Sequence, residues 1–348
     1  MLSKLRATTF LLILFLVYSS SKKSYCYNLY FKLFDDAVGI GHWESDKKFN
    51  FDENGVVLVD SSYNIVTISQ YAIKCFGLFD DTKDTIYLNK FLNQYYYLNN
   101  IGIEVGDSAL YFTYDKPFHD LLPGWTSGLA QAEVAMVFFR FNCLYPSSDN
   151  CHKIKMILNY MIDELCDVSY NSKAVNSFFI HEYKDSRVYN YVLNGHLIGL
   201  ISLIECNQLF EDQPYCEYID AGVRWLEEEL QNYISINERI LFYDLKSKAI
   251  SHPWYMKAVV WEINCLSKLT YSNKLDFYGR LLSFMAYDLN FEFVDCRFNN
   301  LNFISSCFNE CEHENSFMDD KKNFKLIFRL NDRILFAYNY ELNRFIEY

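Results

Sequence analysis

Apolar residues recur at helical spacing along most of this chain. In eight stretches they lie three and four positions apart, which places them on one face of an α-helix. The predicted helices span residues 67–79, 87–98, 127–144, 151–167, 194–209, 218–234, 255–269 and 274–287. Short polar or aromatic connections separate these stretches, so we expect eight helices paired into four helical hairpins.

Other patterns predict short strands. Residues 56–59 are apolar and bounded by turn residues, and residues 110–114 form an aromatic extended segment between helices. Residues 324–328 and 334–338 flank Asn331-Asp332 and predict a β-hairpin. The expected fold class is therefore mainly α, an (α/α) toroid or barrel of about four helical hairpins. Short β segments are expected on its N-terminal side, and a small β appendage at its C-terminal end.

The first residues have the pattern of a secretory signal peptide. Lys4 and Arg6 precede the apolar residues 10–18, and small residues follow at 19–21. This apolar run is far shorter than the roughly 20 residues that span a bilayer, so a retained signal anchor is the less favoured alternative. We expect a protein of the secretory pathway, in the Golgi lumen or outside the cell, with no membrane span after signal removal.

Changes of pattern along the chain predict four parts. They are a signal peptide (1–25), an N-terminal loop and strand segment (26–60), a helical domain (61–288) and a Cys-containing, β-rich appendage (289–348). The formal net charge of -12 argues against a general affinity for nucleic acid. No run of Lys and Arg marks a heparin-binding patch, so the charge also argues against a highly sulfated partner.

Cysteine use fits an oxidising compartment. Among 11 cysteines, Cys143 and Cys151 flank one polar loop, and Cys206 and Cys216 flank another, so each pair is a candidate local disulfide. Three more crowd the C-terminal region, where one can pair with Cys26. Helical patterns predict buried free thiols at Cys75, Cys166 and Cys265. With no Cys-x-x-Cys pair and scattered histidines, we expect no metal and no cofactor.

Residues 182–195 carry the strongest candidate chemistry. Glu182 and Tyr183 stand just before Val192-Leu193-Asn194-Gly195, a turn signal that leads into an apolar run. A carboxylate beside a phenol offers two proton-transfer groups of very different basicity, which suits chemistry at a weakly acidic C–H bond. A comparable block, Gly124-Trp125-Thr126-Ser127-Gly128-Leu129-Ala130-Gln131, precedes another apolar run.

Together these blocks resemble the C-terminal domain of the D-glucuronyl C5-epimerase family (heparosan-N-sulfate-glucuronate 5-epimerase). The likeness covers about residues 52–282, with matching blocks in order at 52–55, 66–71, 90–94, 123–131, 242–245 and 254–255. It implies an isomerase that converts glucuronate to iduronate within heparan- or heparosan-type chains. A proton leaves C5 and another returns to the opposite face. The family's larger N-terminal β-sandwich has no expected counterpart in this chain.

The resemblance also implies roles for individual residues. Glu182, Tyr183, Tyr243 and Tyr255 match its catalytic groups, and Lys246 stands where the family has an arginine that contacts the sugar carboxylate. A tyrosine that acts as a base at neutral pH needs a cationic neighbour to lower its pKa from about 10. Candidate substrate contacts are Trp125, which can stack on sugar or pack in the core, Gln131, which can face a cavity or solvent, and Asn194, which can touch substrate or start a helix.

Two departures from the family pattern keep alternatives open. Lysine at 246 keeps the charge but loses the bidentate fork of arginine. Residues 256–260 are largely apolar where the family has a polar, His-bearing run, which favours a non-catalytic glycan-binding protein. A uronate lyase is a further alternative, because it needs the same C5 proton abstraction. His181 and His252 adjoin the matched motifs as further acid–base candidates. The expected partner is a uronate polysaccharide, and a homodimer is possible by family analogy.

Overall fold

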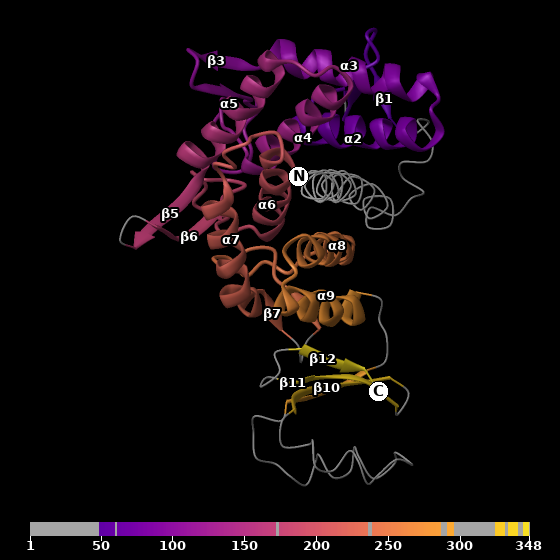
Figure 1. Cartoon of the computed structure of the whole chain (residues 1–348), viewed down its shortest axis with the longest axis vertical. Helices are drawn as coiled ribbons and strands as arrows, with labels where there is room; N and C mark the ends of the chain where they lie inside the picture. The colour runs from indigo at the N-terminus through magenta and orange to yellow at the C-terminus, as the bar shows by residue number, and fades with distance from the viewer. Residues whose placement is uncertain are drawn as a thin grey trace, which may run out of the picture. The chain divides into compact units, whose positions relative to one another are not determined.

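The computed structural model describes residues 49–59, 61–171, 174–235, 239–286, 291–295, 324–330, 333–339 and 344–347 (Figure 1). The predicted signal peptide, the rest of the chain before residue 49, and Cys296, Cys307 and Cys311 lie outside these ranges. The chain divides into a first unit, residues 1–166 and 201–216, and a second unit, residues 167–200 and 217–348. No helix in the described ranges is both long and apolar enough to cross a bilayer.

All eight predicted helices are present in the described part of the chain. They are α2 (Ile65–Thr82), α3 (Thr85–Ile101), α4 (Gly128–Leu144), α5 (Ser148–Leu165), α6 (Leu193–Asn207), α7 (Cys216–Glu229), α8 (Pro253–Thr270) and α9 (Asn273–Ala286). The largest difference is at α7, where the chain tightens into the 3-10 helix η3 (Leu230–Tyr233) before residue 234. The mainly α fold class is confirmed.

Polar residues just before the apolar runs set where helices begin. Asn64, Asp84, Ser127 and Ser147 are the N-caps of α2, α3, α4 and α5, and each side chain accepts a hydrogen bond from a backbone N–H of the first turn. Those N–H groups have no partner inside the helix, so the caps satisfy them. Lys83 ends α2 in the left-handed conformation, with φ 58°, which makes the tight connection to α3 possible.

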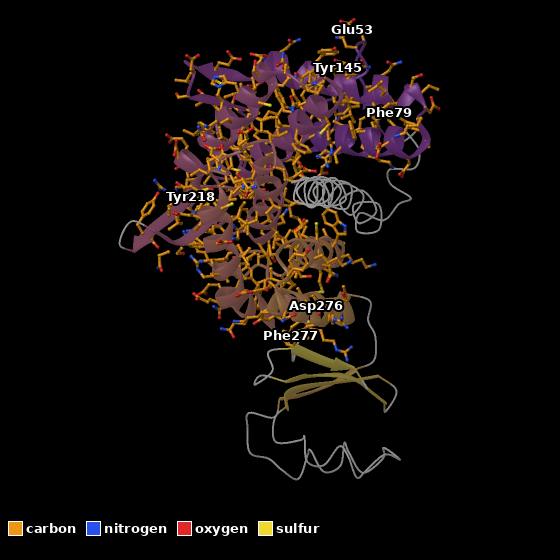
Figure 2. All side chains as sticks on the ribbon, in the orientation of Figure 1. Glu53, Phe79, Tyr145, Tyr218, Asp276 and Phe277 are labelled. Carbon is orange, nitrogen blue, oxygen red and sulfur yellow. The ribbon has the colours of Figure 1, made fainter. Side chains whose placement is uncertain are left out.

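In the first unit, helices pack around α4. Helices α2 and α3 form one hairpin, α4 and α5 form another, and α2 also packs on α4 (Figure 1). The C-terminal half of α6 joins them, because Ser202 Oγ donates to the carbonyl oxygen of Ala132 at 2.9 Å. A buried ion pair links the same helices, with Arg140 2.8 Å from Glu205. Tyr145, labelled in Figure 2, follows the last residue of α4.

In the second unit, glycines bring helix pairs close together. A Cβ placed on Gly222 of α7 would lie 2.6 Å from Leu200 of α6, and one placed on Gly279 of α9 would lie 2.1 Å from the Asn264 side chain of α8. A larger residue at either position would push the paired helices apart. Helices α8 and α9 form the last hairpin, on which Figure 2 labels Phe277.

The strands form small sheets beside the helices. The two-stranded pairs are β1 (Asn50–Phe51) with β2 (Val57–Leu58), β3 (Ile103–Val105) with β4 (Ala109–Tyr111), β5 (Cys166–Asn171) with β6 (Ala174–Ile180), and β7 (Ile234–Ser235) with β8 (Ile240–Leu241). The predicted C-terminal hairpin is confirmed in a four-stranded sheet of order β12-β11-β10-β9, made by β9 (Phe291–Asp295), β10 (Phe324–Leu330), β11 (Arg333–Asn339) and β12 (Arg344–Glu347).

The β5–β6 pair was not predicted from the sequence. The pattern placed residues 166 and 167 in a helix, but α5 ends at Leu165 and Cys166 is already extended, with φ -116° and ψ 152°. The apolar spacing continues across this boundary, so the helical period alone does not show where the strand begins.

The two predicted local disulfides are absent. Cys151, Cys206 and Cys216 are free thiols, so neither Cys143–Cys151 nor Cys206–Cys216 is bridged. Cys206 is fully buried, with its sulfur 3.7 Å from the carbonyl oxygen of Ala135, whereas Cys216 is exposed. Residues that flank a loop in sequence can therefore face different surroundings. The prediction that Cys75, Cys166 and Cys265 are buried is confirmed.

Candidate active site

The predicted catalytic residues all lie in the second unit, at the ends of three elements. Glu182 and Tyr183 follow β6, in a loop of residues 181–192 that we call the Glu182 loop. Tyr243 follows β8, in residues 242–252, which we call the Tyr243 loop. Tyr255 lies in the first turn of α8, and Asn194 lies in the first turn of α6.

The N-terminus of α6 joins the two loops to α8. The backbone N–H of Leu193 donates to the carbonyl oxygen of Tyr243 at 3.3 Å, and that of Asn194 donates to the Tyr255 hydroxyl at 3.2 Å. The same hydroxyl donates to Oδ1 of Asn194 at 3.1 Å. The first N–H groups of a helix lack internal partners, and here Tyr243 and Tyr255 supply them. These hydrogen bonds therefore hold the start of α6 in place against Tyr243 and Tyr255.

Glu182 is a buried carboxyl packed against the start of α6. Its side chain meets Gly195 so closely that a Cβ at position 195 would lie 2.7 Å from Glu182 Cβ and 3.2 Å from its backbone N and Cα. Oε2 of Glu182 is buried without a hydrogen-bond partner among the residues that the structure describes. Burial raises the pKa of this carboxyl to about 7, and its hydrogen bond with Tyr183 offsets only part of the rise.

Gly195→Ala should therefore displace Glu182. The added Cβ overlaps both the side chain and the backbone of Glu182, so we expect a loss of about 1–3 kcal/mol in unfolding free energy and a loss of catalysis. Chemical denaturation measures the unfolding free energy of the variant, and a kinetic assay measures its catalytic rate. Gly199→Ala is the matched control, because its Cβ would meet Ile180 instead, at 2.3 Å. It should cost stability and spare the catalytic rate. Equal rate losses in the two variants would contradict a specific role for the Gly195 contact.

Three tyrosines extend from Glu182. Tyr243 donates a hydrogen bond to the Tyr183 hydroxyl at 3.4 Å, and the rings of Tyr243 and Tyr255 lie 5.0 Å apart between centroids. Tyr189 lies against both Tyr183 and Tyr243, with ring centroids 6.0 Å and 5.5 Å away. Tyr189 had no predicted role, because nothing in the spacing of the Glu182 loop distinguishes it from the other tyrosines.

The tyrosines hold their protons at neutral pH. Burial is the largest cause that raises the pKa values of Tyr183, Tyr243 and Tyr255 above 10, and the charge of Glu182 raises all three further. A tyrosine that acts as a base at neutral pH needs a lowered pKa, whereas the structure raises the pKa of all three tyrosines. Near pH 7 the arrangement therefore offers one base, the Glu182 carboxylate, and several phenolic acids.

Asp244 organises the Tyr243 loop. Its side chain is fully buried, and Oδ1 accepts the backbone N–H groups of Lys246 at 2.9 Å and Ser247 at 2.7 Å. The Ser247 hydroxyl donates to Oδ2. An aspartate that accepts hydrogen bonds from the backbone two and three residues later is the usual signature of a turn, so the order Asp244-x-x-Ser247 is a turn signal in the sequence itself.

The amino group of Lys246 is exposed and connects the two loops. Its Nζ donates to the carbonyl oxygen of Arg187, in the Glu182 loop, at 2.7 Å. A lysine that is held by one neutral carbonyl at the surface can exchange that contact for a charged ligand. Its predicted role toward the sugar carboxylate remains a prediction.

Trp125 and Gln131 belong to the first unit. Trp125 is half-buried, stacks on Tyr114 with 4.2 Å between ring centroids, and donates from Nε1 to the carbonyl oxygen of Lys116 at 2.9 Å. Gln131 is fully buried and donates to the carbonyl oxygen of Phe112 at 2.9 Å. Both side chains have structural partners in their own unit, and their predicted substrate contacts remain predictions.

The apolar residues after Tyr255 face the protein interior. Met256, Val259 and Val260 are buried along α8, so packing accounts for their apolar character. Of the two histidines next to the matched motifs, His181 is buried and His252 is exposed. Among the described residues, no group of three or more His, Cys, Asp or Glu side chains is arranged to hold a metal ion.

Comparison with known proteins shows to which family the chain is related. Residues 102–280, more than half of the chain, match the family model described as D-glucuronyl C5-epimerase C-terminus. This range includes both loops and the starts of α6 and α8. No curated protein matches the chain significantly.

Three solved structures are similar to this chain at low scores. A GH76 α-mannanase of Bacteroides thetaiotaomicron is 11% identical, with a TM-score of 0.47 over 76% of this chain and 72% of its own. A cellobiose 2-epimerase from Bacillus thermoamylovorans is 16% identical, with a TM-score of 0.48 over 75% and 72%. A sugar epimerase from a ruminal bacterium is 10% identical, with a TM-score of 0.47 over 74% and 70%. At these scores and identities the likenesses support no inference about activity.

Proposed function

Because this chain belongs to the D-glucuronyl C5-epimerase C-terminal family, we propose that it converts glucuronate to iduronate within a heparan- or heparosan-type polysaccharide. Membership of the family makes the protein a carbohydrate epimerase, an isomerase. The uronate substrate and the C5 position are the proposal. The observation that supports it most is the buried Glu182 carboxyl with a pKa near 7, joined to a row of protonated tyrosines.

We assign the base to Glu182 and the acid to Tyr243. The ionised Glu182 removes the C5 proton, and the electron pair moves into the uronate carboxylate to give an enediolate-like intermediate. Tyr243 then donates its proton to C5 from the other face, which leaves a phenolate. Tyr183 is hydrogen-bonded to both Glu182 and Tyr243, so a proton passed from Glu182 through Tyr183 restores the starting state.

Groups near Glu182 and Tyr243 are assigned to stabilise the negative charge that develops during the reaction. The C5 proton lies beside a carboxylate and is very weakly acidic, so the site must neutralise charge that develops on that carboxylate. Lys246 is assigned to this role, since its exposed amino group is held only by the Arg187 carbonyl in the contacts described above. Tyr255 is assigned a positioning role, since Asn194 holds its hydroxyl at the start of α6 and its ring packs against the Tyr243 ring with 5.0 Å between centroids.

Exchange of hydrogen for deuterium tests the proposal. The full-length protein is incubated in deuterated water with heparosan, N-sulfated heparosan and unsulfated chondroitin, and the products are analysed by NMR. We expect iduronate that carries deuterium at C5, without an unsaturated sugar. An unsaturated uronate, detected by its ultraviolet absorbance, would assign a lyase instead. No deuterium at C5 of any uronate would overturn the proposal and favour a glycan-binding protein.

The rate of exchange should depend on pH through Glu182. Since the base must be ionised, kcat/KM for exchange should rise with pH through a pKa near 7 and level off above it. The profile is measured with the active uronan from about pH 3.5 to about 9, so that limbs near the ordinary glutamate pKa and near 7 are both visible. Asp185→Asn is the matched control, because Asp185 is an exposed acid in the same loop. It should leave this limb in place. A limb near the ordinary glutamate pKa of 4.5 would contradict the assignment of Glu182 as the base.

We also propose a location in the secretory pathway, supported by the basic and apolar pattern of residues 1–25. Expression in cultured cells, with N-terminal sequencing of the product, tests it. Mature protein that begins near residue 26 is expected, and an uncleaved cytosolic product would refute it. The homodimer suggested by family analogy is tested by light scattering of the same material.

A further inference from the structure

One carboxylate outside the proposed proton-transfer groups contacts three parts of the Glu182 loop. Asp167, on β5, has Lys184 Nζ at 2.9 Å from Oδ1. On Oδ2 it has His181 Nε2 at 2.8 Å and the Tyr191 hydroxyl at 3.2 Å. His181 and Lys184 lie within the first four residues of the loop, and Tyr191 lies next to its end. We call Asp167 with these partners the Asp167 clasp.

We propose that Asp167 is a positioning residue, whose clasp holds the Glu182 loop in the shape that buries the Glu182 carboxyl and places Tyr183 against Tyr243. This inference rests on the proposed function, because it concerns how the same site is held. Asp167 acts through other side chains and has no assigned contact with substrate.

The first support is that the clasp encloses the acid–phenol pair. His181 immediately precedes Glu182, and Lys184 immediately follows Tyr183, so both ends of the pair are tied to one carboxylate. The chain turns directly afterwards, where the backbone N–H of Ser186 donates to the carbonyl oxygen of Tyr183 at 3.2 Å. With both neighbours held, the backbone of residues 182 and 183 has little freedom to move.

The second support is the conformation of Tyr191. Its φ is 57°, in the left-handed region that residues with a side chain seldom adopt, so surrounding contacts must hold it there. Its hydroxyl reaches Asp167, and its carbonyl oxygen accepts a hydrogen bond from the Tyr233 hydroxyl at 2.5 Å. Tyr191 stands three residues before Asn194, so the clasp also fixes the loop where α6 begins.

The third support is electrostatic. Burial would raise the pKa of Asp167, but the hydrogen bond from Lys184 and the close contact with the His181 ring outweigh that effect and lower the pKa to about 2. The Asp167 carboxylate therefore stays ionised at neutral pH. Burial lowers the pKa of His181, so His181 adds no positive charge beside Glu182 at neutral pH. Among the described residues, the charge of Glu182 acts on three titratable side chains, those of Tyr183, Tyr243 and Tyr255.

Kinetics of Asp167→Asn test the proposal in the full-length protein. With heparosan as the probe, we expect kcat for C5 exchange to fall by about 10- to 100-fold, because a small displacement of a catalytic group has effects of this size. KM should change by less than about twofold, because Asp167 has no assigned contact with substrate. The acid limb of the rate profile should move down by about one pH unit as water reaches Glu182. Asp167→Glu should restore part of kcat, and Asp185→Asn should behave as the wild type.

A measurement without substrate separates this inference from the proposed function. The difference in stability between the wild type and Glu182→Gln above pH 7 reports how strongly Glu182 is buried. In the Asp167→Asn background that difference should shrink. If no uronan supports exchange, the proposed function fails, and this difference still tests the clasp.

Single-tether variants cover the case in which Asp167→Asn does not fold. Lys184→Met and Tyr191→Phe each remove one contact and should shift kcat, the acid limb and the stability difference in the same direction by less. Wild-type values of all three quantities in the folded variants would overturn the clasp.

Discussion

Glu182→Gln should lower C5 exchange by about 10³-fold, the largest effect that we expect from a single substitution. Glutamine keeps the shape of the side chain but cannot accept a proton, so the glucuronate C5 proton has no base. The fold should remain intact because Glu182 makes no ion pair among the described contacts. The measurement is deuterium incorporation into glucuronate at pH 8, where the wild-type carboxyl is ionised.

The same substitution should make the protein more stable above pH 7. The pKa of Glu182 rises from 4.5 to about 7 on folding, so the folded state binds the proton more tightly than the unfolded state. The stability that comes from this proton is present below pH 4.5 and is lost as pH rises through about 7. Glutamine does not suffer this loss, and the gain over wild type at pH 8 is on the order of 3 kcal/mol.

Denaturation curves at pH 4.5 and pH 8 measure this gain. Asp185→Asn is again the control, since Asp185 is an exposed acid of the same loop and lies outside the proposed proton-transfer groups. A Glu182→Gln variant that is equally stable relative to wild type at both pH values would mean that Glu182 is hydrated in solution. Retention of fast exchange would remove it from the mechanism.

Tyr243→Phe should separate exchange from inversion. Without the phenolic acid, protonation from the second face fails, and iduronate formation should fall by about 10²- to 10³-fold. Glu182 can still remove the C5 proton and, as the acid, return hydrogen to the same face. Deuterium should therefore continue to enter glucuronate, although less rapidly, because the intermediate lacks its second proton donor.

NMR distinguishes these products in one incubation, since deuterated glucuronate and deuterated iduronate have separate signals. Tyr170→Phe is the matched control, because Tyr170 lies on β5 in the same unit and is 60% exposed. It should leave both products at wild-type levels. Equal losses of exchange and inversion in Tyr243→Phe would show that Tyr243 does not act on the second face alone.

Much of the fold was readable from the sequence because its signals are local. The 3.6-residue period of apolar residues predicted all eight α-helices of the described part of the chain. Four of these helices begin at a polar N-cap residue that directly precedes the apolar run, namely Asn64, Asp84, Ser127 and Ser147. The start of β5 was missed because helical spacing continues into it. The local disulfides were wrong because spacing in sequence does not show that Cys206 is buried and Cys216 exposed.

The candidate site was only partly readable. The motifs located Glu182, Tyr183, Tyr243 and Tyr255, and the structure places all four in one unit. Their protonation states were not readable, because a pKa depends on burial and on neighbours that the chain brings from far away. Tyr243 donates to Tyr183 across 60 residues of sequence, and Tyr255 meets Asn194 across 61.

The sequence by itself therefore determined the helices, their caps and the identity of the acid–phenol pair, since each depends on residues within a few positions of one another. Only the tertiary structure decided that Glu182 is the group poised near neutral pH and that the tyrosines keep their protons. It also decided that Asp167 holds their loop. Desolvation and long-range contacts exist only after folding, and they set which group takes a proton and which gives one.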